Sequence, residues 1–318
     1  MQRVGEPQAA NAVLMIRPTA FESNPETLAS NAFQTEAAAN DDIATRVQAE
    51  FEAVAETLMT AGVRVHAFDG RAERDCPDEI FPNNWVSFHP DGTVVLYPML
   101  APSRRRERRT EIIDALAREH GYAITRTINL TGHEVHGGAL EGTGSLVLDR
   151  ANRVAYACRS PRTNEQALAD FAEQLSYTSA VFDAVDRSGN PVYHTNVMMS
   201  VGTQFAVVCL GAIADPAVRE AITRRLEESG RDIVDITLEQ MHAFAANLIE
   251  LEGRDGTVIA LSERAVEALG DSQVQVLADC GELIPVGIPT VETYGGGGLR
   301  CMLAEIHLPA EDAAALMS

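Results

Sequence analysis

Cys301 stands in the sequence setting that best suits a nucleophile, because the glycines 295–298 and Arg300 precede it closely. A nucleophilic cysteine needs access for its substrate and a lowered pKa. The glycines would allow close approach, and Arg300 adds local positive charge. The alternative is a buried, inert cysteine at the start of a strand, as most free cysteines are buried. Three other cysteines lie in or beside apolar runs and are expected in the core: Cys158, Cys209 and Cys280.

A thiolate nucleophile requires a nearby histidine, which in turn requires an orienting carboxylate. His194 is the candidate histidine, because it lies in an apolar segment that we expect to be a strand, where an unpaired imidazole would be costly. A histidine satisfied within the core is the other interpretation. Glu141 is the candidate carboxylate, in a glycine-rich bend immediately before an expected strand. Taken alone, it would be interpreted as a solvated loop residue.

The segment 76–85 is dense in groups that could bind a small polar molecule. It holds the carboxylate of Asp78, the neighbouring amides of Asn83 and Asn84, and Trp85, the only tryptophan. Polar groups beside an aromatic ring suit recognition of a planar polar group. A turn packed by Trp85 is the competing interpretation.

No metal site or organic cofactor is expected. His133 and His136 flank Glu134, but their spacing differs from the helical His-Glu-x-x-His of zinc proteases. The glycines around Glu141 suggest a phosphate-binding loop only weakly, because neither a Gly-Lys-Ser/Thr ending nor a following helix is expected there.

Short apolar runs and amphipathic segments alternate along the chain, which predicts an α/β fold. The expected strands are Ala12–Ile16, Thr93–Tyr97, Ser145–Leu148, Val192–Met199, Phe205–Leu210, Val258–Ser262 and Ile306–Leu308. The expected helices are Ile43–Ala61, Arg105–His120, Asn164–Leu175, Asp215–Glu228, Leu238–Asn247 and Glu263–Leu269. No linker divides the chain, so we expect one domain over residues 1–318, with hints of a repeated strand-and-helix unit.

Composition limits the partners. The net charge of −21 disfavours nucleic-acid and membrane-surface binding. No signal peptide and no membrane span are expected, and five scattered cysteines suit a reducing compartment, so a cytoplasmic location is predicted. The expected partner is a small molecule, and the sequence leaves open whether the chain forms a homo-oligomer.

These segments, in this order, resemble the pentein or guanidine-modifying superfamily. It includes arginine deiminases, dimethylarginine dimethylaminohydrolases, amidinotransferases and N-succinylarginine dihydrolases. The likeness is strongest to amidinotransferase-related citrulline-utilisation hydrolases. The matching segments are Met15–Pro18, Asn31–Gln34, Pro77–Trp85, Ala101–Arg105, Leu140–Ser145, Arg159–Asn164, His194–Met199 and Cys301.

The resemblance implies a five-bladed αβ propeller, with the site in its central channel, and a role for each matching residue. Cys301 resembles the nucleophile, His194 the general acid/base and Glu141 the carboxylate that orients the histidine. Asp78 is placed like the residue that holds the substrate α-amino group. Arg104 and Arg162 are placed like the arginines that bind its α-carboxylate. Arg17 and Phe21 are expected near the mouth of the site.

Two departures from the family pattern bear on the substrate. Arginine deiminases hold the guanidinium with two aspartates, where this chain has Asn84 and Asn196. Dimethylarginine enzymes also carry a carboxylate at the first of these positions. A neutral ureido group needs no countercharge and can both donate to and accept from asparagine amides. We therefore expect hydrolysis of citrulline to ornithine, carbon dioxide and ammonia through a covalent cysteine intermediate.

Other reactions remain open at the same site. Arginine deimination, dihydrolysis of an acylated arginine and amidino transfer use the same nucleophile on related substrates. A non-catalytic binding member of the fold is a further alternative. The joint presence of Cys301, His194 and Glu141 argues against that alternative.

Overall fold

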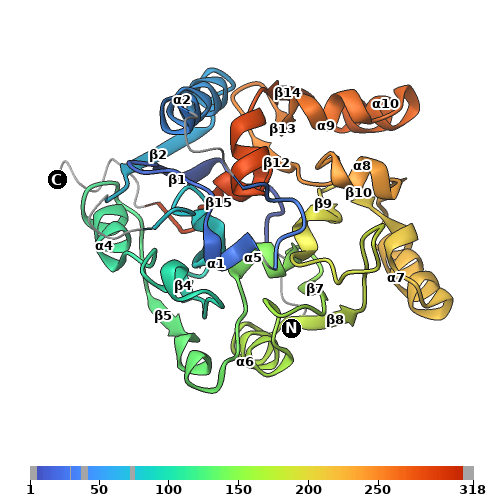
Figure 1. The fold of residues 1–318 in the computed structure, drawn as a ribbon, viewed down its shortest axis with the longest axis horizontal. Helices are drawn as coiled ribbons and strands as arrows, with labels where there is room; N and C mark the ends of the chain where they lie inside the picture. Colours follow the sequence, from blue (N-terminus) through green and yellow to red (C-terminus); the bar gives the residue numbers. More distant parts are fainter. Residues whose placement is uncertain (1–5, 29, 37–41, 72–75, 311–318) are drawn as a thin grey trace.

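The strands of the protein form five small sheets arranged around one axis (Figure 1). The computed structural model describes residues 6–28, 30–36, 42–71 and 76–310. In each sheet the middle strand pairs antiparallel with one neighbour and parallel with the other. Parallel neighbours need a long crossover, and helices supply it in every module.

The modules are built from the following elements. The first contains β15 (Ala304–Glu305), β1 (Ala12–Arg17), β2 (Arg64–Asp69), α1 (Pro25–Leu28) and α2 (Ile43–Thr60). The second contains β3 (Val86–Phe88), β4 (Thr93–Leu96), β5 (Arg126–Asn129), α3 (Pro102–Arg105) and α4 (Thr110–Arg118). The third contains α5 (Gly142–Ser145), β6 (Val147–Asp149), β7 (Val154–Cys158), β8 (Thr178–Phe182) and α6 (Glu165–Leu175). The fourth contains β9 (Met199–Val201), β10 (Phe205–Val208), β11 (Asp232–Asp235) and α7 (Pro216–Glu228). The fifth contains α8 (Leu238–His242), β12 (Ile249–Glu252), β13 (Thr257–Ser262), β14 (Glu282–Val286), α9 (Glu263–Ala268) and α10 (Asp271–Cys280).

The two ends of the described chain close the ring. β15 pairs antiparallel with β1, with Val13 opposite Glu305 and Leu14 opposite Ala304. A sheet shared by the first and last strands holds the modules in one closed domain. The architecture is the five-bladed αβ propeller of the pentein fold, as the family resemblance implies.

Apolar packing explains why the longer helices lie at the periphery (Figure 1). The buried residues of α2 recur at helical spacing, and they pack in the cluster that contains Val13 and Met15 of β1. The alternate residues Leu14 and Ile16 point into a second cluster around Trp85. β1 is therefore buried on both faces, which explains its continuous apolar sequence.

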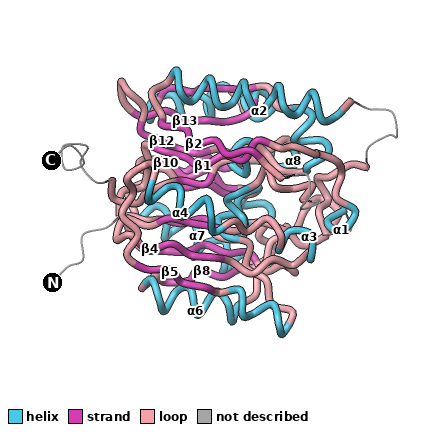
Figure 2. The backbone as a smooth tube through the Cα atoms, turned by 90° about the vertical axis from the view of Figure 1, so that its left-hand side faces the viewer, coloured by secondary structure: helices cyan, strands magenta, loops and turns pink. Residues whose placement is uncertain are grey.

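Short helical turns precede the strands nearest the axis and carry the candidate residues. These turns are the 3₁₀-helices Pro82–Asn84, Thr195–Val197 and Leu299–Met302 and the single-turn helix α5. The turn Pro82–Asn84 contacts both α5 and Leu299–Met302, and α5 contacts Thr195–Val197. The turns therefore meet at one end of the channel. Figure 2 shows α1 and α3 together at one end of the molecule.

Several sequence predictions are wrong in detail. The expected strand Val192–Met199 is mostly a loop with a 3₁₀-helix, and only Met199 enters β9. The expected strand Ile306–Leu308 lies outside β15. The expected helix Arg105–His120 is two helices, α3 and α4. A short helix, α5, does follow Glu141, contrary to expectation.

Candidate active site

The candidate residues from distant parts of the sequence line one cavity at the end of the channel. Its empty volume is about 270 Å³, and its walls include Asp78, Asn84, Arg104, Arg162, His194 and Cys301. Asn83, Glu141 and Asn196 are buried directly behind this wall and bond to it. The ordered set of predicted residues is therefore brought together by the fold.

His194 and Glu141 form a buried pair. His194 is extended, immediately before the 3₁₀-helix Thr195–Val197, and its Nε2 lies 2.8 Å from Oε2 of Glu141. Burial lowers the pKa of His194 to about 4, against the opposing effect of Glu141. The imidazole is thus neutral at physiological pH, which suits a group that must accept a proton.

Two arginines keep Glu141 ionised. Burial alone raises the pKa of Glu141, but Arg162, His194 and Arg104 together hold it well below its usual range. The NH1 groups of Arg162 and Arg104 lie 3.4 and 3.5 Å from the same carboxylate oxygen that binds His194. The charge of Glu141 is therefore largely compensated within the protein.

Gly144 lets the site close around this pair. A Cβ at Gly144 would stand 2.5 Å from Nδ2 of Asn84 and 2.7 Å from Nδ1 of His194. Both distances are shorter than real Cβ contacts allow. Only glycine admits Asn84 and His194 together here.

Cys301 lies between apolar packing and the polar cavity. Its side chain is 3% exposed and belongs to an apolar cluster on one side. Its Sγ lies 3.4 Å from Nδ2 of Asn196 and 3.4 Å from Nδ2 of Asn247. Burial raises the thiol pKa, and Asn247, Arg300 and Asn196 offset part of that effect. The empty site therefore holds a neutral thiol with amide donors ready for a thiolate.

Arg104 is part of a buried network. Its Nε and NH2 donate to Glu107 at 2.9 and 3.0 Å, and its NH1 donates to Oδ1 of Asn84 at 2.8 Å. Because arginine has no acceptor, this contact fixes which side of the Asn84 amide faces Arg104. The surface salt bridge considered as an alternative for Arg104 is wrong, since the side chain is 2% exposed.

Asp78 and Arg162 keep atoms free for a ligand. Oδ2 of Asp78 accepts from Nδ2 of Asn24 at 2.8 Å, whereas Oδ1 has no hydrogen-bond partner among the described residues. Burial raises the pKa of Asp78, against the opposing effect of Arg104. Arg162 donates to Ser30 at 2.8 Å and stacks over Tyr193, but its Nε has no partner among the described residues. Such orphaned buried groups mark a place where a ligand or water completes the bonding.

The two residues predicted at the mouth differ in position. Phe21 is buried beside the glycine run, since a Cβ at Gly295 would meet its ring at 3.2 Å. Arg17 pairs with Glu52 and Asp69, is partly exposed and does not line the cavity.

Comparison with known proteins identifies the family. The sequence family described as eukaryotic N,N dimethylarginine dimethylhydrolase matches residues 17–308, which is most of the chain. The chain belongs to this family. It is thus a member of the guanidine-modifying pentein superfamily of hydrolases that act on C–N bonds. A search of curated protein sequences found no match.

Solved structures show the same fold. ArgZ, an arginine dihydrolase from cyanobacteria, superposes with a TM-score of 0.72 at 16% identity over 95% of this chain and 41% of ArgZ. The N-terminal domain of ArgZ bound to substrate gives a TM-score of 0.71 at 16% identity, covering 93% of this chain and 97% of the domain. A Pseudomonas aeruginosa dimethylarginine enzyme complexed with citrulline gives 0.65 at 14% identity, covering 94% of this chain and all of that one. The chain therefore spans about two fifths of full-length ArgZ.

Sequence reasoning missed Asn247, a buried contact of Cys301. The available signal was a repeated position: Asn84, Asn196, Asn247 and Cys301 each stand two or three residues before the strand nearest the axis. Each is followed by two apolar residues. The repeat is visible only after the modules are aligned by structure.

Metal binding finds no support in the described residues, which contain no cluster of three or more His, Cys, Asp or Glu able to hold an ion. His133 pairs instead with Asp170 at 2.6 Å. None of the described helices is long and apolar enough to cross a membrane.

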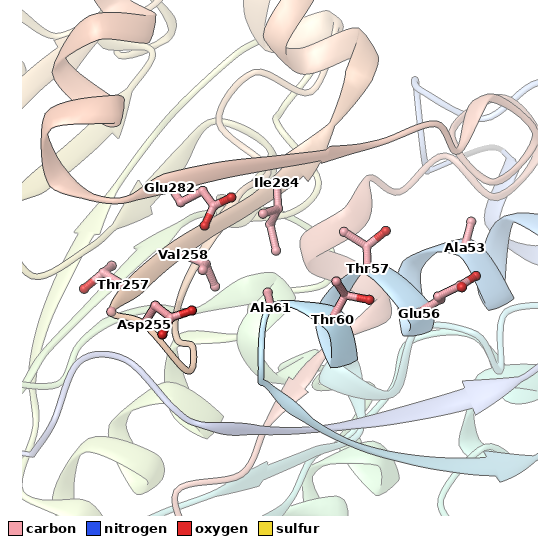
Figure 3. A pocket seen from close by; sticks show the side chains of 11 residues that line it. Ala53, Glu56, Thr57, Thr60, Ala61, Asp255, Thr257, Val258, Glu282 and Ile284 are labelled. Carbon is pink, nitrogen blue, oxygen red and sulfur yellow. The ribbon is translucent and has the colours of Figure 1, made fainter.

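A larger hollow lies on the surface, away from the candidate residues (Figure 3). It is an open groove between the end of α2 and the strands β13 and β14, with an empty volume of about 1380 Å³ including open solvent. Glu56, Asp255 and Glu282 line it, and no candidate residue does. Size alone therefore does not mark the reactive site.

Proposed function

We propose that the chain is a cysteine-dependent hydrolase that converts citrulline and water to ornithine, carbon dioxide and ammonia. One observation carries the proposal: the described side chains that bond to Sγ of Cys301 are amides, from Asn196 and Asn247, and none is a carboxylate. The group that reaches Cys301 therefore meets a neutral, hydrogen-bonding wall.

Charge balance supports a neutral substrate group. Glu141 is the ionised carboxylate beside His194, and two arginines already face it. A buried guanidinium would need a carboxylate of its own, and each missing charge-assisted hydrogen bond costs about 1.5–3 kcal/mol. A ureido group carries no charge and avoids this cost.

Hydrogen-bonding capacity supports the same substrate. Oδ1 of Asn196 and Nδ2 of Asn83 are buried without partners among the described residues. A ureido group has N–H donors for the first and a carbonyl acceptor for an amide donor. At the far end, the free oxygen of Asp78 suits an α-amino group, and Arg162 suits an α-carboxylate.

The proposed reaction has two stages. Cys301 gives its proton to His194 as sulfur attacks the ureido carbon, and His194 passes that proton to the departing nitrogen. If the bond to the ornithine side chain breaks first, a carbamoyl group remains on sulfur. Water then attacks this group, gives a proton to His194 and releases carbamate, which decomposes to carbon dioxide and ammonia. The returning proton restores the thiol.

Arginine is the second candidate substrate, and a specific observation favours it. Glu141 is held ionised at the cavity and could pair with a guanidinium. The similar ArgZ structures come from an arginine dihydrolase. The dimethylarginine enzyme complexed with citrulline shows, in turn, that a related site accepts a ureido compound.

A substrate panel separates these reactions. Purified protein is incubated with citrulline, arginine, asymmetric dimethylarginine or N-succinylarginine, and ornithine and ammonia are quantified. The proposal predicts ornithine and ammonia in equal amounts from citrulline, with arginine a poorer substrate. Two ammonia molecules per ornithine from arginine, with citrulline inert, would overturn it. Cys301→Ser is the matched inactive control and should retain the wild-type melting temperature.

A further inference from the structure

Asn247 occupies the place in the fifth module that Asn84 and Asn196 occupy in theirs. It stands two residues before β12, at the end of the loop that follows α8. Its side chain is 1% exposed. The side chain therefore points into the protein, where an amide must find partners.

The partners of Asn247 fix the orientation of its amide. Nδ2 donates to the backbone carbonyl of Asn196 at 2.9 Å, so this atom must be the nitrogen. The same nitrogen lies 3.4 Å from Sγ of Cys301, and Oδ1 lies 3.7 Å from it. The amide thus faces the sulfur side-on: Oδ1 can accept from the thiol, and Nδ2 can donate to a thiolate.

The backbone around Asn247 is shaped to allow this approach. A Cβ at Gly298 would lie 2.6 Å from Oδ1 of Asn247, so the glycine leaves the space that the amide occupies. Phe244, at the turn that leads to Asn247, has a positive φ of 61°, which costs free energy for a residue with a side chain. The backbone N–H of Asn247 bonds to the carbonyl of Phe244 at 2.8 Å. A strained turn and a glycine together place one amide against one sulfur.

We propose that Asn247 is a catalytic residue that, with Asn196, forms a pair of amide donors for the thiolate of Cys301. The inference rests on the proposed role of Cys301 as nucleophile, and it does not depend on which substrate is used. Two neutral donors stabilise a sulfur anion without presenting a competing charge. They thereby compensate for the burial that disfavours the anion.

Alkylation of Cys301 tests this role without substrate. The rate of reaction with iodoacetamide is followed between pH 6 and 10 by peptide mass mapping, which separates Cys301 from the other cysteines. In Asn247→Ala the pH midpoint should rise by about one unit, a roughly tenfold slower reaction at a fixed pH below it. Asn247→Asp should raise the midpoint at least as far, because a carboxylate repels the thiolate.

Gly298→Ala provides a second variant that leaves residue 247 unchanged. The added methyl group would displace the Asn247 amide, so the midpoint should rise again. Asn190→Ala removes an exposed asparagine and should leave the midpoint unchanged. An unchanged midpoint in both Asn247→Asp and Gly298→Ala, with native circular dichroism, would overturn the inference. Raised midpoints in a protein that ignores citrulline would instead reject only the proposed substrate.

Discussion

Nε2 of His194 lies 2.8 Å from Oε2 of Glu141, and both side chains are buried. The same carboxylate oxygen also faces Arg104 and Arg162. One oxygen therefore orients the imidazole and links it to the cluster that lines the cavity. This relationship connects residues that are 53 positions apart in the chain.

Glu141→Gln should separate orientation from charge. The amide keeps the shape of the side chain but no longer stabilises a protonated His194. We expect kcat for citrulline to fall by about 10²–10⁴-fold, the usual range for general acid–base catalysis. Glu134→Gln changes a carboxylate that pairs with Arg108 outside the cavity, and it should retain near wild-type kcat. Equal activity of the two variants would remove Glu141 from the reaction.

His194 should make the stability of the protein depend on pH. Burial lowers its pKa to about 4 from 6.5, so between these values the unfolded chain binds a proton that the folded protein does not. The contribution is fully present above pH 6.5 and is lost as the pH falls towards 4. His194→Gln should therefore show a smaller loss of unfolding free energy between pH 7 and 4.5, by at most about 3 kcal/mol. Urea unfolding at several pH values measures this, and parallel curves for the two proteins would contradict it.

Asn196→Asp should shift the substrate preference. The new carboxylate would lie beside Cys301, where it can pair with a guanidinium but disfavours the thiolate. The ratio of kcat/KM for arginine to that for citrulline should rise by about 10–100-fold, the equivalent of one charge-assisted hydrogen bond. Asn190→Asp adds the same charge at an exposed position and should leave the ratio unchanged. A ratio that stays constant in Asn196→Asp would argue that the amides do not select the substrate.

Gly144→Ala tests the close approach of Asn84 and His194. The methyl group would meet both side chains at distances below 3 Å, so one of them must move. We expect activity to fall by at least tenfold with a modest loss of melting temperature. Gly211→Ala meets no atom within 4 Å and is the matched control. Full activity of Gly144→Ala would show that the pair tolerates displacement.

The sequence predicts the longer elements because each has a periodic apolar face of its own. The pattern of Ile43, Val47, Phe51, Val54 and Leu58 is enough to identify α2, and these residues are buried as expected. The wrong strand around His194 has a different cause. Val192–Met199 is apolar because it lies at the crowded axis, and its 3₁₀-helix is determined by neighbouring modules rather than by local periodicity.

The candidate site divides in the same way. Cys301, His194 and Glu141 could be chosen by residue type and by family likeness, since thiol, imidazole and carboxylate have few alternatives in the chain. Asn247 could not, because a single asparagine in an apolar stretch resembles any turn residue. Arg104 differs again: its position in the cavity wall is as expected, but Glu107 already binds its guanidinium from both sides. Only the folded geometry shows that its donors are shared with the protein.

The central claim is that Cys301 attacks an uncharged ureido carbon, and trapping the covalent adduct tests it most directly. The protein is mixed with citrulline labelled with ¹³C at the ureido carbon, quenched in acid within milliseconds to seconds, and digested for mass mapping. The account predicts the labelled carbon on the peptide that contains Cys301, its loss as ornithine forms, and no adduct in Cys301→Ser. Ornithine produced with no label on Cys301 at any time, or with label on another residue, would contradict it.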